Sequence, residues 1–321
     1  KVGPGQTARI FTGAPVPKGA DAIVMQEDTE VAGDQITMTV APWPGKFVRP
    51  AGLDFQLGDV GITANRVLSS RDVGLAAAMN VPWLTVARRP RIALLATGDE
   101  IVRPGEPVGP NQIISSNTIA LMGLIKASGG EAIDLGIASD DEASLRALAA
   151  GARGADMLVT LGGASVGDHD LVRKVLGQDG LELDFWRIAM RPGKPLIFGS
   201  IGETPMMGMP GNPVSSLVCG IVYLRPAVRA MLGLDPHAAS QTARLGQDLP
   251  GNDLRQDYLR ATASLNEDGE TVVTPFDKQD SSMLSRLAKA DCLILRAPHA
   301  DPAKAGERVE ILPLSGETTG I

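Results

Sequence analysis

Three glycine-containing loops carry most of the side chains in this sequence that could do chemistry, and each follows a short apolar run. Asp99 and Glu100 follow "RIALLATG", residues 162–170 ("GGASVGDHD") follow "DMLVTL", and residues 210–216 ("PGNPVSS") follow "PMMGM". Ligands of an open parallel sheet bind outside the carboxyl ends of its strands. Glycine lets backbone approach a ligand, and two of these loops lead into predicted helices, whose N-termini attract oxyanions. The pattern predicts an anion site, although helix capping alone also selects Asp, Ser and Gly.

Acidic side chains in the same loops would repel an anion unless a cation lies between them. The chain has a net charge of −7, and "GDHD" places Asp168 and Asp170 beside the predicted site. Carboxylates are the hard oxygen ligands that hold Mg²⁺ against substrate phosphates. We therefore expect Mg²⁺ to be bound by Glu100, Asp168 and Asp170. His169 has no second histidine near it, so a capping or surface role is favoured over metal binding.

Positive charge is supplied by "RIAMRPGKP", in which Arg191 and Lys194 flank a Pro-Gly turn. Arginine offers a bidentate fork and lysine a compact charge, which together suit phosphate or a tetrahedral oxyanion. Considered alone, a solvated turn is the better interpretation; beside three anion-attracting loops, the segment provides the missing positive charge. The sequence contains neither a Walker loop nor a G-x-G-x-x-G fingerprint, which disfavours an ordinary ATPase or NAD enzyme.

The elements that would position these residues alternate from Arg91 onward between apolar strands and helices. The expected strands are 91–97, 131–137, 156–161, 183–190, 195–200 and 205–209, and the expected helices are 116–128, 140–152, 168–176 and 213–224. Helix-linked apolar strands predict a parallel α/β sheet covered on both faces.

The flanking segments have a different character. We expect a β-rich domain over residues 1–60, with strands at 7–13, 21–26 and 35–40, and a helical segment with linker over 61–88, whose helix is 69–80. The α/β domain then covers 89–235. A C-terminal β domain covers 236–321, with a hairpin around the Asp-Gly turn of 258–276 and a last strand at 307–314.

Composition limits the possible partners. Aromatic residues make up 3% of this acidic chain, which disfavours nucleic-acid binding, and no apolar run reaches the roughly 20 residues of a membrane helix. Cys219 and Cys292 lie in apolar surroundings without metal-ligand spacing, which indicates buried thiols in a reducing compartment. We expect a cytoplasmic protein, and the lack of an initiator Met or a signal region at its start indicates a fragment.

Five motifs occur in the order found in one family. "RIFTGAPVPKGADAIVMQED", "LLATGDEI", "LVTLGGASVGDHD", "DFWRIAMRPGKPLIFG" and "GMPGNPVSS" resemble the molybdopterin molybdenumtransferases, the MoeA and gephyrin E-domain family. The resemblance implies a multidomain α/β plus β fold. A central parallel α/β molybdopterin-binding domain is then flanked by an N-terminal β-rich domain and a C-terminal small β-barrel-like domain.

The activity that the resemblance implies is Mg²⁺-assisted insertion of molybdate into adenylylated molybdopterin with release of AMP. It also implies an elongated homodimer, in which Thr12 and Asp54 reach the α/β domain of the partner subunit. The catalytic residues carried over by motif are Asp54, Glu100, Asp168, Asp170 and Lys194. The substrate-binding residues are Thr12, Asp99, Gly162, Gly163, Ser165, Arg191, Pro210, Gly211, Asn212, Pro213, Ser215, Arg255 and Ser281.

Two features depart from the family pattern. Arg191 stands where the family commonly has Lys, which keeps the charge and changes the geometry. The chain starts after the family's "SAMDGYA"-like stretch, so we expect part of the helical domain and one carboxylate to be missing.

Two other functions remain open at this stage. The α/β domain could adenylylate molybdopterin, because adenylyltransferases share its "GGxSxGxxD"-type loop; such an adenylyltransferase is otherwise the expected partner. A catalytically silent scaffold of the gephyrin kind is the second alternative, although the acidic residues and Lys194 argue against it.

Overall fold

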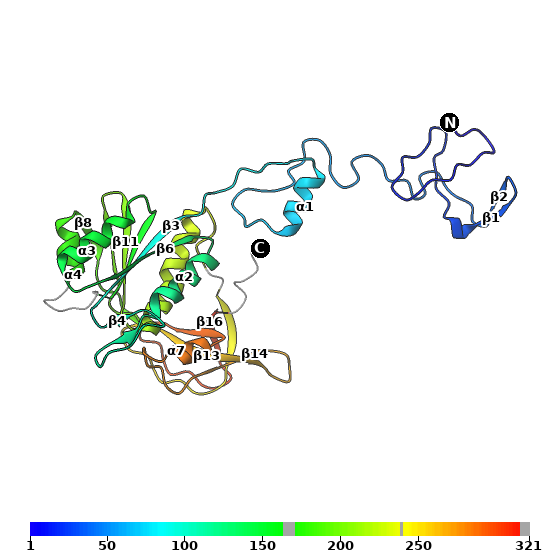
Figure 1. Ribbon diagram of the computed structural model, residues 1–321. Coiled ribbons are helices and arrows are strands. Elements are labelled where there is room, and N and C mark those ends of the chain that lie inside the picture. The colour runs from blue at the N-terminus through cyan, green and yellow to red at the C-terminus, as the bar shows by residue number, and fades with distance from the viewer. Residues whose placement is uncertain (163–170, 238–239, 315–321) are drawn as a thin grey trace. The chain divides into compact units, whose positions relative to one another are not determined.

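The computed structural model describes residues 1–162, 171–237 and 240–314. The chain forms two compact units, one of residues 1–63 and 71–82, the other of 64–70 and everything from Trp83 onward (Figure 1). Each unit is described by itself below.

In the larger unit, the described strands of the α/β domain form a six-stranded sheet in the order β6-β3-β7-β11-β10-β8. Their bounds are β3 (Arg91–Thr97), β6 (Glu131–Ala138), β7 (Met157–Leu161), β8 (Leu181–Phe185), β10 (Ile197–Ile201) and β11 (Thr204–Met209). The first four strands of this order are parallel, which confirms the predicted sheet. β10 runs antiparallel to both neighbours because only Gly202 and Glu203 separate it from β11, too short for a crossover helix.

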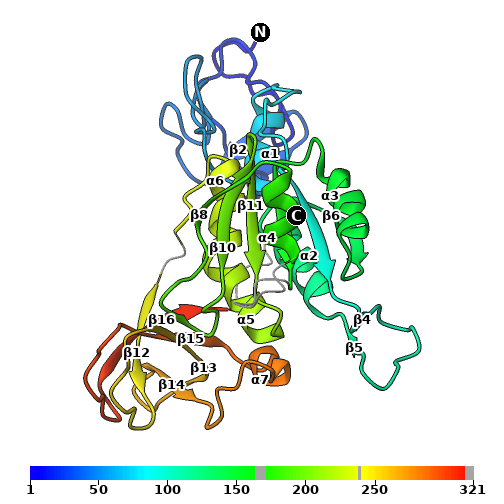
Figure 2. The ribbon, with the colours of Figure 1, turned by 90° about the vertical axis from the view of Figure 1, so that its left-hand side faces the viewer.

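Helices cover both faces of this sheet (Figure 2). One face packs against α2 (Asn117–Ala127), α5 (Pro213–Cys219), the π-helix η3 (Gly220–Leu224) and α6 (Arg225–Met231). The other packs against α3 (Glu142–Ala149), the 3-10 helix η2 (Ala150–Ala152) and α4 (Leu171–Gln178). β3 shows why such strands form: after Arg91, every residue of "RIALLAT" is buried. A strand between two helical layers has no face for polar side chains.

The helix through α5, η3 and α6 is longer than the sequence predicted. It runs without a break over the 19 residues Pro213–Met231, in which an 18-residue window has a mean hydropathy of 1.3, and by length and composition it could span a membrane. The sequence has no uninterrupted apolar run of this length, as expected; the helix reaches it by continuing through Arg225 and Arg229, beyond the predicted end at residue 224. Val214, Val218, Leu224 and Val228 lie in the core, so it is a core helix of the α/β domain.

The C-terminal part of the larger unit is a small barrel, as expected. Its strands are β12 (Gln241–Leu245), β13 (Gln256–Leu265), β14 (Thr271–Pro275), β15 (Cys292–Arg296) and β16 (Arg308–Pro313). They pair in the order β14-β12-β16-β15-β13, and β13 pairs again with β14, which closes the barrel. The predicted hairpin is confirmed, with Gly269 of its Asp-Gly turn at φ +77°. The short helix α7 (Leu284–Ala288) follows β14.

One predicted strand is divided between the two sheets. Residues 183–190 were expected to be continuous, but β8 ends at Phe185 and β9 (Met190–Arg191) pairs in parallel with the start of β13. The division follows from pairing across 66 residues of sequence, which local periodicity does not report.

A short arm and the smaller unit complete the fold. β4 (Ile101–Val102) and β5 (Ile113–Ile114) form the arm, which follows β3. The smaller unit contains the 3-10 helix η1 (Gln26–Asp28), β1 (Thr29–Ala32), β2 (Gln35–Met38) and most of α1 (Ser70–Ala78).

Two strands expected in the smaller unit do not form. Within its described residues, regular strand pairing is confined to the hairpin β1–β2, so the strands predicted at 7–13 and 21–26 are wrong. None of the residues in either segment is buried. Within the described chain, residues 21–26 make only two backbone bonds to a neighbouring segment, between Ile23 N–H and the Lys46 carbonyl and between Gly45 N–H and the Asp21 carbonyl, so neither segment has a strand ladder or a core to face.

Candidate functional site

The ends of the parallel strands bring the predicted loops together at one edge of the sheet. Gly162 N–H, directly after β7, donates to the carbonyl of Met209 at the end of β11, with N···O 3.3 Å. Thr97 Oγ1, at the end of β3, donates to the carbonyl of Leu161 at 3.4 Å. Three of the predicted loops therefore leave the sheet side by side.

A side chain at Gly162 would crowd the end of β3. Its φ is +89°, and a Cβ there would lie 3.0 Å from the Thr97 carbonyl oxygen. The loop begins as a close approach between two backbones. Gly163, Ser165, Asp168, His169 and Asp170 lie outside the described residues.

Two carboxylates face one cavity at this edge. Glu100 and Asp140 line a space of about 190 Å³ together with Thr97, Gly98, Leu145, Leu171 and Val172. Asp99 N–H donates to Asp140 Oδ2 at 3.4 Å, and Asp140 N–H donates to Asp99 Oδ1 at 3.1 Å. These two bonds tie the loop after β3 to the loop after β6.

Asp140 was not among the predicted site residues. It stands in "SDDEAS", which reads as a helix cap, and its neighbour Asp141 does cap α3, accepting a bond from Ser144 N–H at 2.8 Å. The signal that would have found Asp140 is its position two residues after the end of β6, a fourth parallel strand.

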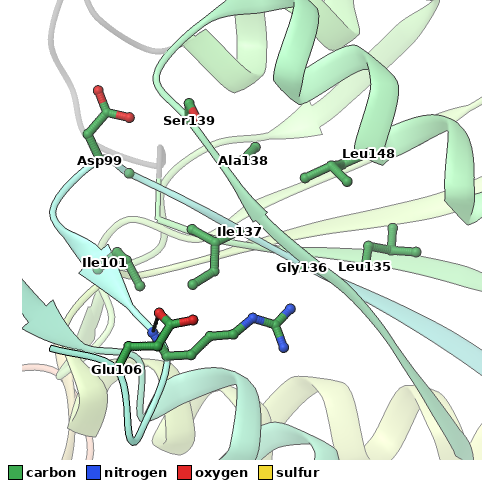
Figure 3. Close-up of a pocket in the computed structure, with 11 residues that line it drawn as sticks. Asp99, Ile101, Glu106, Leu135, Gly136, Ile137, Ala138, Ser139 and Leu148 are labelled. Atoms are coloured by element: carbon green, nitrogen blue, oxygen red, sulfur yellow. Dashed lines mark hydrogen bonds between the residues drawn. The ribbon is translucent and has the colours of Figure 1, made fainter.

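Asp99 also lines a larger cavity of about 490 Å³ on the outer side of β6 (Figure 3). Leu135, Ile137 and Leu148 give this cavity an apolar wall. Arg103 and Glu106 add charge at its rim, where Arg103 N–H donates to Glu106 Oε2 at 2.8 Å.

The described residues offer oxygen donors suited to Mg²⁺. No group of three or more His, Cys, Asp or Glu in the described ranges is spaced to hold a metal ion. Mg²⁺, however, is usually bound by one or two carboxylates together with waters and substrate phosphates, so Glu100 and Asp140 fit its chemistry.

The loop "PGNP" is held from two sides. Asn117 Nδ2, in the first turn of α2, donates to the Gly211 carbonyl at 2.7 Å. From the barrel side, Ser281 accepts two bonds: its Oγ from Asn212 Nδ2 at 3.0 Å and its carbonyl from Val214 N–H at 3.0 Å. The predicted residues Asn212 and Ser281 are therefore in contact. Pro210, Gly211 and Pro213 belong to the same loop, and Ser215 is buried in the first turn of α5.

Arg260 holds the segment that carries Ser281. Its side chain is fully buried on β13, where Nε donates to Gln279 Oε1 at 3.0 Å and Nη1 to the Asp280 carbonyl at 2.7 Å. Burial lowers the pKa of this guanidinium. Sequence reasoning selected Arg255 instead, whose Nη2 bonds to Asp253 Oδ2 at 2.6 Å. The missed signal was a charged residue between the apolar positions of an alternating strand.

The turn that carries Arg191 and Lys194 lies at the same edge as the loops. β10 is antiparallel to β11, and Ile197 pairs with Gly208, so β10 begins where β11 ends. The residues just before β10 are therefore beside the carboxyl ends of the parallel strands. Arg191 pairs with Asp257 of the barrel: Nε lies 2.8 Å from Oδ1, and Nη2 bonds to Oδ2.

Lys194 is exposed, and within the described residues no side chain pairs with its amine. Between the two cations, Gly193 rests against Cys219 of α5. Thr12 and Asp54 lie in the smaller unit, where both side chains are exposed.

Comparisons with known proteins agree with the five motifs. Three family models match: "MoeA N-terminal region (domain I and II)" over residues 1–80, "Probable molybdopterin binding domain" over 93–230, and "MoeA C-terminal region (domain IV)" over 242–314.

Similar curated proteins carry the name molybdopterin molybdenumtransferase. The one from Nostoc sp. is 39% identical over 235 residues, 72% of this chain and 54% of that protein, so the match spans about half of that relative. The one from Haemophilus influenzae is 34% identical over 315 residues, 96% of this chain and 77% of that protein. A crystal structure of a Pyrococcus molybdopterin biosynthesis MoeA protein superposes with a TM-score of 0.82 at 32% identity, covering 98% of this chain and 78% of that one.

Proposed function

Because the chain belongs to the molybdopterin molybdenumtransferase family of molybdenum cofactor biosynthesis, we propose that it inserts molybdate into adenylylated molybdopterin and releases AMP. The observation that carries the proposal is the edge at which Glu100 and Asp140 face one cavity beside Gly162. The turn with the exposed Lys194 borders the same edge. Carboxylates and an exposed lysine beside the close backbone approach at Gly162 suit a substrate that carries both phosphates and an oxyanion.

Each residue would contribute position or charge. Gly162 and Gly163 would leave room for the phosphate-bearing pterin, and Lys194 would stabilise the negative charge of molybdate or of the departing phosphate. Glu100 and Asp140 would hold Mg²⁺, joined by Asp168 and Asp170 as the motif resemblance implies, and the ion, when bound, would neutralise the phosphoanhydride and polarise its phosphorus. No covalent enzyme intermediate is required, since positioning and charge stabilisation account for the chemistry.

The test is AMP release from adenylylated molybdopterin in the presence of molybdate. We expect Glu100→Gln and Lys194→Ala each to lower turnover about 100-fold or more, in the range of losing one transition-state contact. Matched controls are Glu203→Gln, in the β10–β11 turn at the opposite edge, and Lys126→Ala, at the end of α2. All four variants are compared at equal thermal stability. Wild-type AMP release by the first two would contradict the assigned roles, and production rather than consumption of the adenylylated substrate would identify an adenylyltransferase.

We also propose that the protein works as a homodimer. Of the described residues in the smaller unit, only Lys46, Asp72 and Ala76 are buried, while Phe11, Trp43, Leu53 and Leu57 are exposed. A unit with so little core gains stability by burying apolar side chains against a second subunit. Thr12 and Asp54 would then serve the partner's site.

Subunit complementation tests this arrangement. Asp54→Asn and Glu100→Gln are each expected to be inactive alone. Mixed by co-expression, they should recover about a quarter of wild-type activity, since half of the dimers are mixed and one of their two sites carries no substitution. A mixture that stays inactive, or a chain that is monomeric by light scattering, would contradict the proposal.

The proposed location is the cytoplasm, with a molybdopterin adenylyltransferase as the partner that supplies the substrate. Both cysteines are free and buried, which supports a reducing compartment.

A further inference from the structure

The turn from Arg191 to Lys194 connects two domains of the larger unit. At its start, Met190 and Arg191 pair with Gln256 and Asp257 of the barrel. Its end leads into β10 of the α/β sheet, and its middle rests on Cys219 of α5. The position of Lys194 therefore depends on contacts made by both domains.

The Arg191 guanidinium donates hydrogen bonds to three acceptor side chains of the barrel. Besides the bidentate pair with Asp257, its Nη1 lies 3.2 Å from Asp253 Oδ2, and its Nη2 lies 3.2 Å from Asn252 Oδ1. The Asp257 side chain is only 5% exposed, so its charge is compensated by this guanidinium and little by solvent. Arg255 shares Asp253 with Arg191, so two guanidiniums face two carboxylates and the cluster as a whole is neutral. Because this cluster is neutral as a whole, it would attract an anion only weakly.

Resting on the proposed function, we propose that Arg191 is a positioning residue. Its fork on Asp257 fixes the turn, and Lys194 is the cation of this turn that meets the oxyanion. The fork explains the residue type, because a lysine at position 191 could not make two parallel bonds to one carboxylate. The bidentate pair also gives Arg191 and Lys194 different roles, although the sequence presents them as two equivalent cations.

Hydrogen exchange tests the positioning without any need for turnover. Ile188 N–H donates to the Lys194 carbonyl at 3.1 Å, so exchange in the peptide 186–196 reports whether the turn is fixed. Arg191→Gln, Asp257→Asn and the double variant should raise exchange in this peptide equally, at least threefold. Arg244→Gln is the matched control, since it breaks a bidentate pair with Glu270 elsewhere in the barrel and should leave the peptide unchanged. Exchange at the wild-type rate in the two single variants would overturn the inference.

Kinetics then test whether Arg191 acts through Lys194. Arg191→Gln should raise the KM for molybdate severalfold in the presence of Lys194 and have no further effect in a Lys194→Ala background. Asp257→Asn should raise the same KM, because it releases the turn. If Arg191 contacted the oxyanion itself, its effect would multiply with that of Lys194→Ala, and Asp257→Asn would lower the KM by freeing the guanidinium. A wild-type chain that releases no AMP would refute the proposed function, while the exchange result would still decide the role of Arg191.

Discussion

Gly193 is the position in the turn at which a single methyl group should have a large effect. Its φ is +117°, and a Cβ built there would lie 2.5 Å from Cys219 Sγ and 3.6 Å from Met190 Sδ. Backbone strain in this region costs about 1–3 kcal/mol for a residue other than glycine. Overpacking against a buried side chain costs about 1–3 kcal/mol more. Gly193→Ala should therefore lower the free energy of unfolding by about 2–6 kcal/mol, out of a typical total of about 5–15 kcal/mol.

Thermal unfolding followed by circular dichroism measures this effect. For a unit of this size, the expected loss corresponds to a fall in Tm of about 5–20 °C. The matched control is Gly123→Ala, at an exposed position within α2, where a Cβ meets no atom within 4 Å apart from the helix's own backbone. There the same substitution should stabilise the helix by about 0.5–1 kcal/mol.

A double substitution separates steric overlap from backbone strain. Cys219→Ala removes the sulfur that the new methyl group meets, so Gly193→Ala combined with Cys219→Ala should be more stable than the sum of the single effects by about 1–3 kcal/mol. Gly193→Ala with an unchanged Tm would refute the packing argument outright. Strictly additive effects would leave only backbone strain as the cause.

Three further predictions concern the barrel, the "PGNP" loop and the thiols. Hydrogen bonds from Arg255 depress the pKa of Asp253 to about 2, so Asp253→Asn should lower Tm at neutral pH. The difference in Tm between this variant and the wild type should vanish as the pH falls from 4 towards 2, because the wild-type carboxylate is then protonated. A difference in Tm that grows on acidification would contradict the assigned sign. Asn212→Ala should lower the free energy of unfolding, measured in urea, by about 0.5–1.5 kcal/mol. Ser281→Ala should lower it little further in the Asn212→Ala background, and fully additive effects would contradict the hydrogen bond between the two side chains. Burial raises the pKa of Cys219 to about 12 and the pKa of Cys292 to about 11. Iodoacetamide should therefore label neither thiol in the folded protein at pH 8, and labelling without urea would show that a thiol is accessible.

The parts of the fold that could be predicted are those specified by local pattern. β3 and β7 are continuous, mainly apolar runs. Every residue of β7 is buried, and so is every residue of β3 after the first. The hairpin of β13 and β14 follows from alternation around an Asp-Gly turn. In these cases periodicity and turn chemistry act within a few residues, which a sequence displays directly.

The parts that could not be predicted depend on partners distant in the chain. β9 separates from β8 because Arg191 pairs with Asp257, and no local periodicity encodes that pairing. The same contact distinguishes Arg191 from Lys194, which look alike in "RPGK". The role of Arg260 cannot be predicted from its own strand, because its side chain holds a segment 19 residues further along the chain, through Gln279.

The short strand β9 also determines how the molecule can be divided by an engineer. The first half of β13 pairs with β15 on one side, and on its other side β9 pairs with Gln256 and Asp257. A recombinant barrel cut at the start of β12 would lose this cover, exposing a strand edge and leaving Asp257 without its counter-charge. Transplanting the barrel between relatives therefore requires residues 190–194 to travel with it, although they lie some 50 residues upstream in the α/β domain.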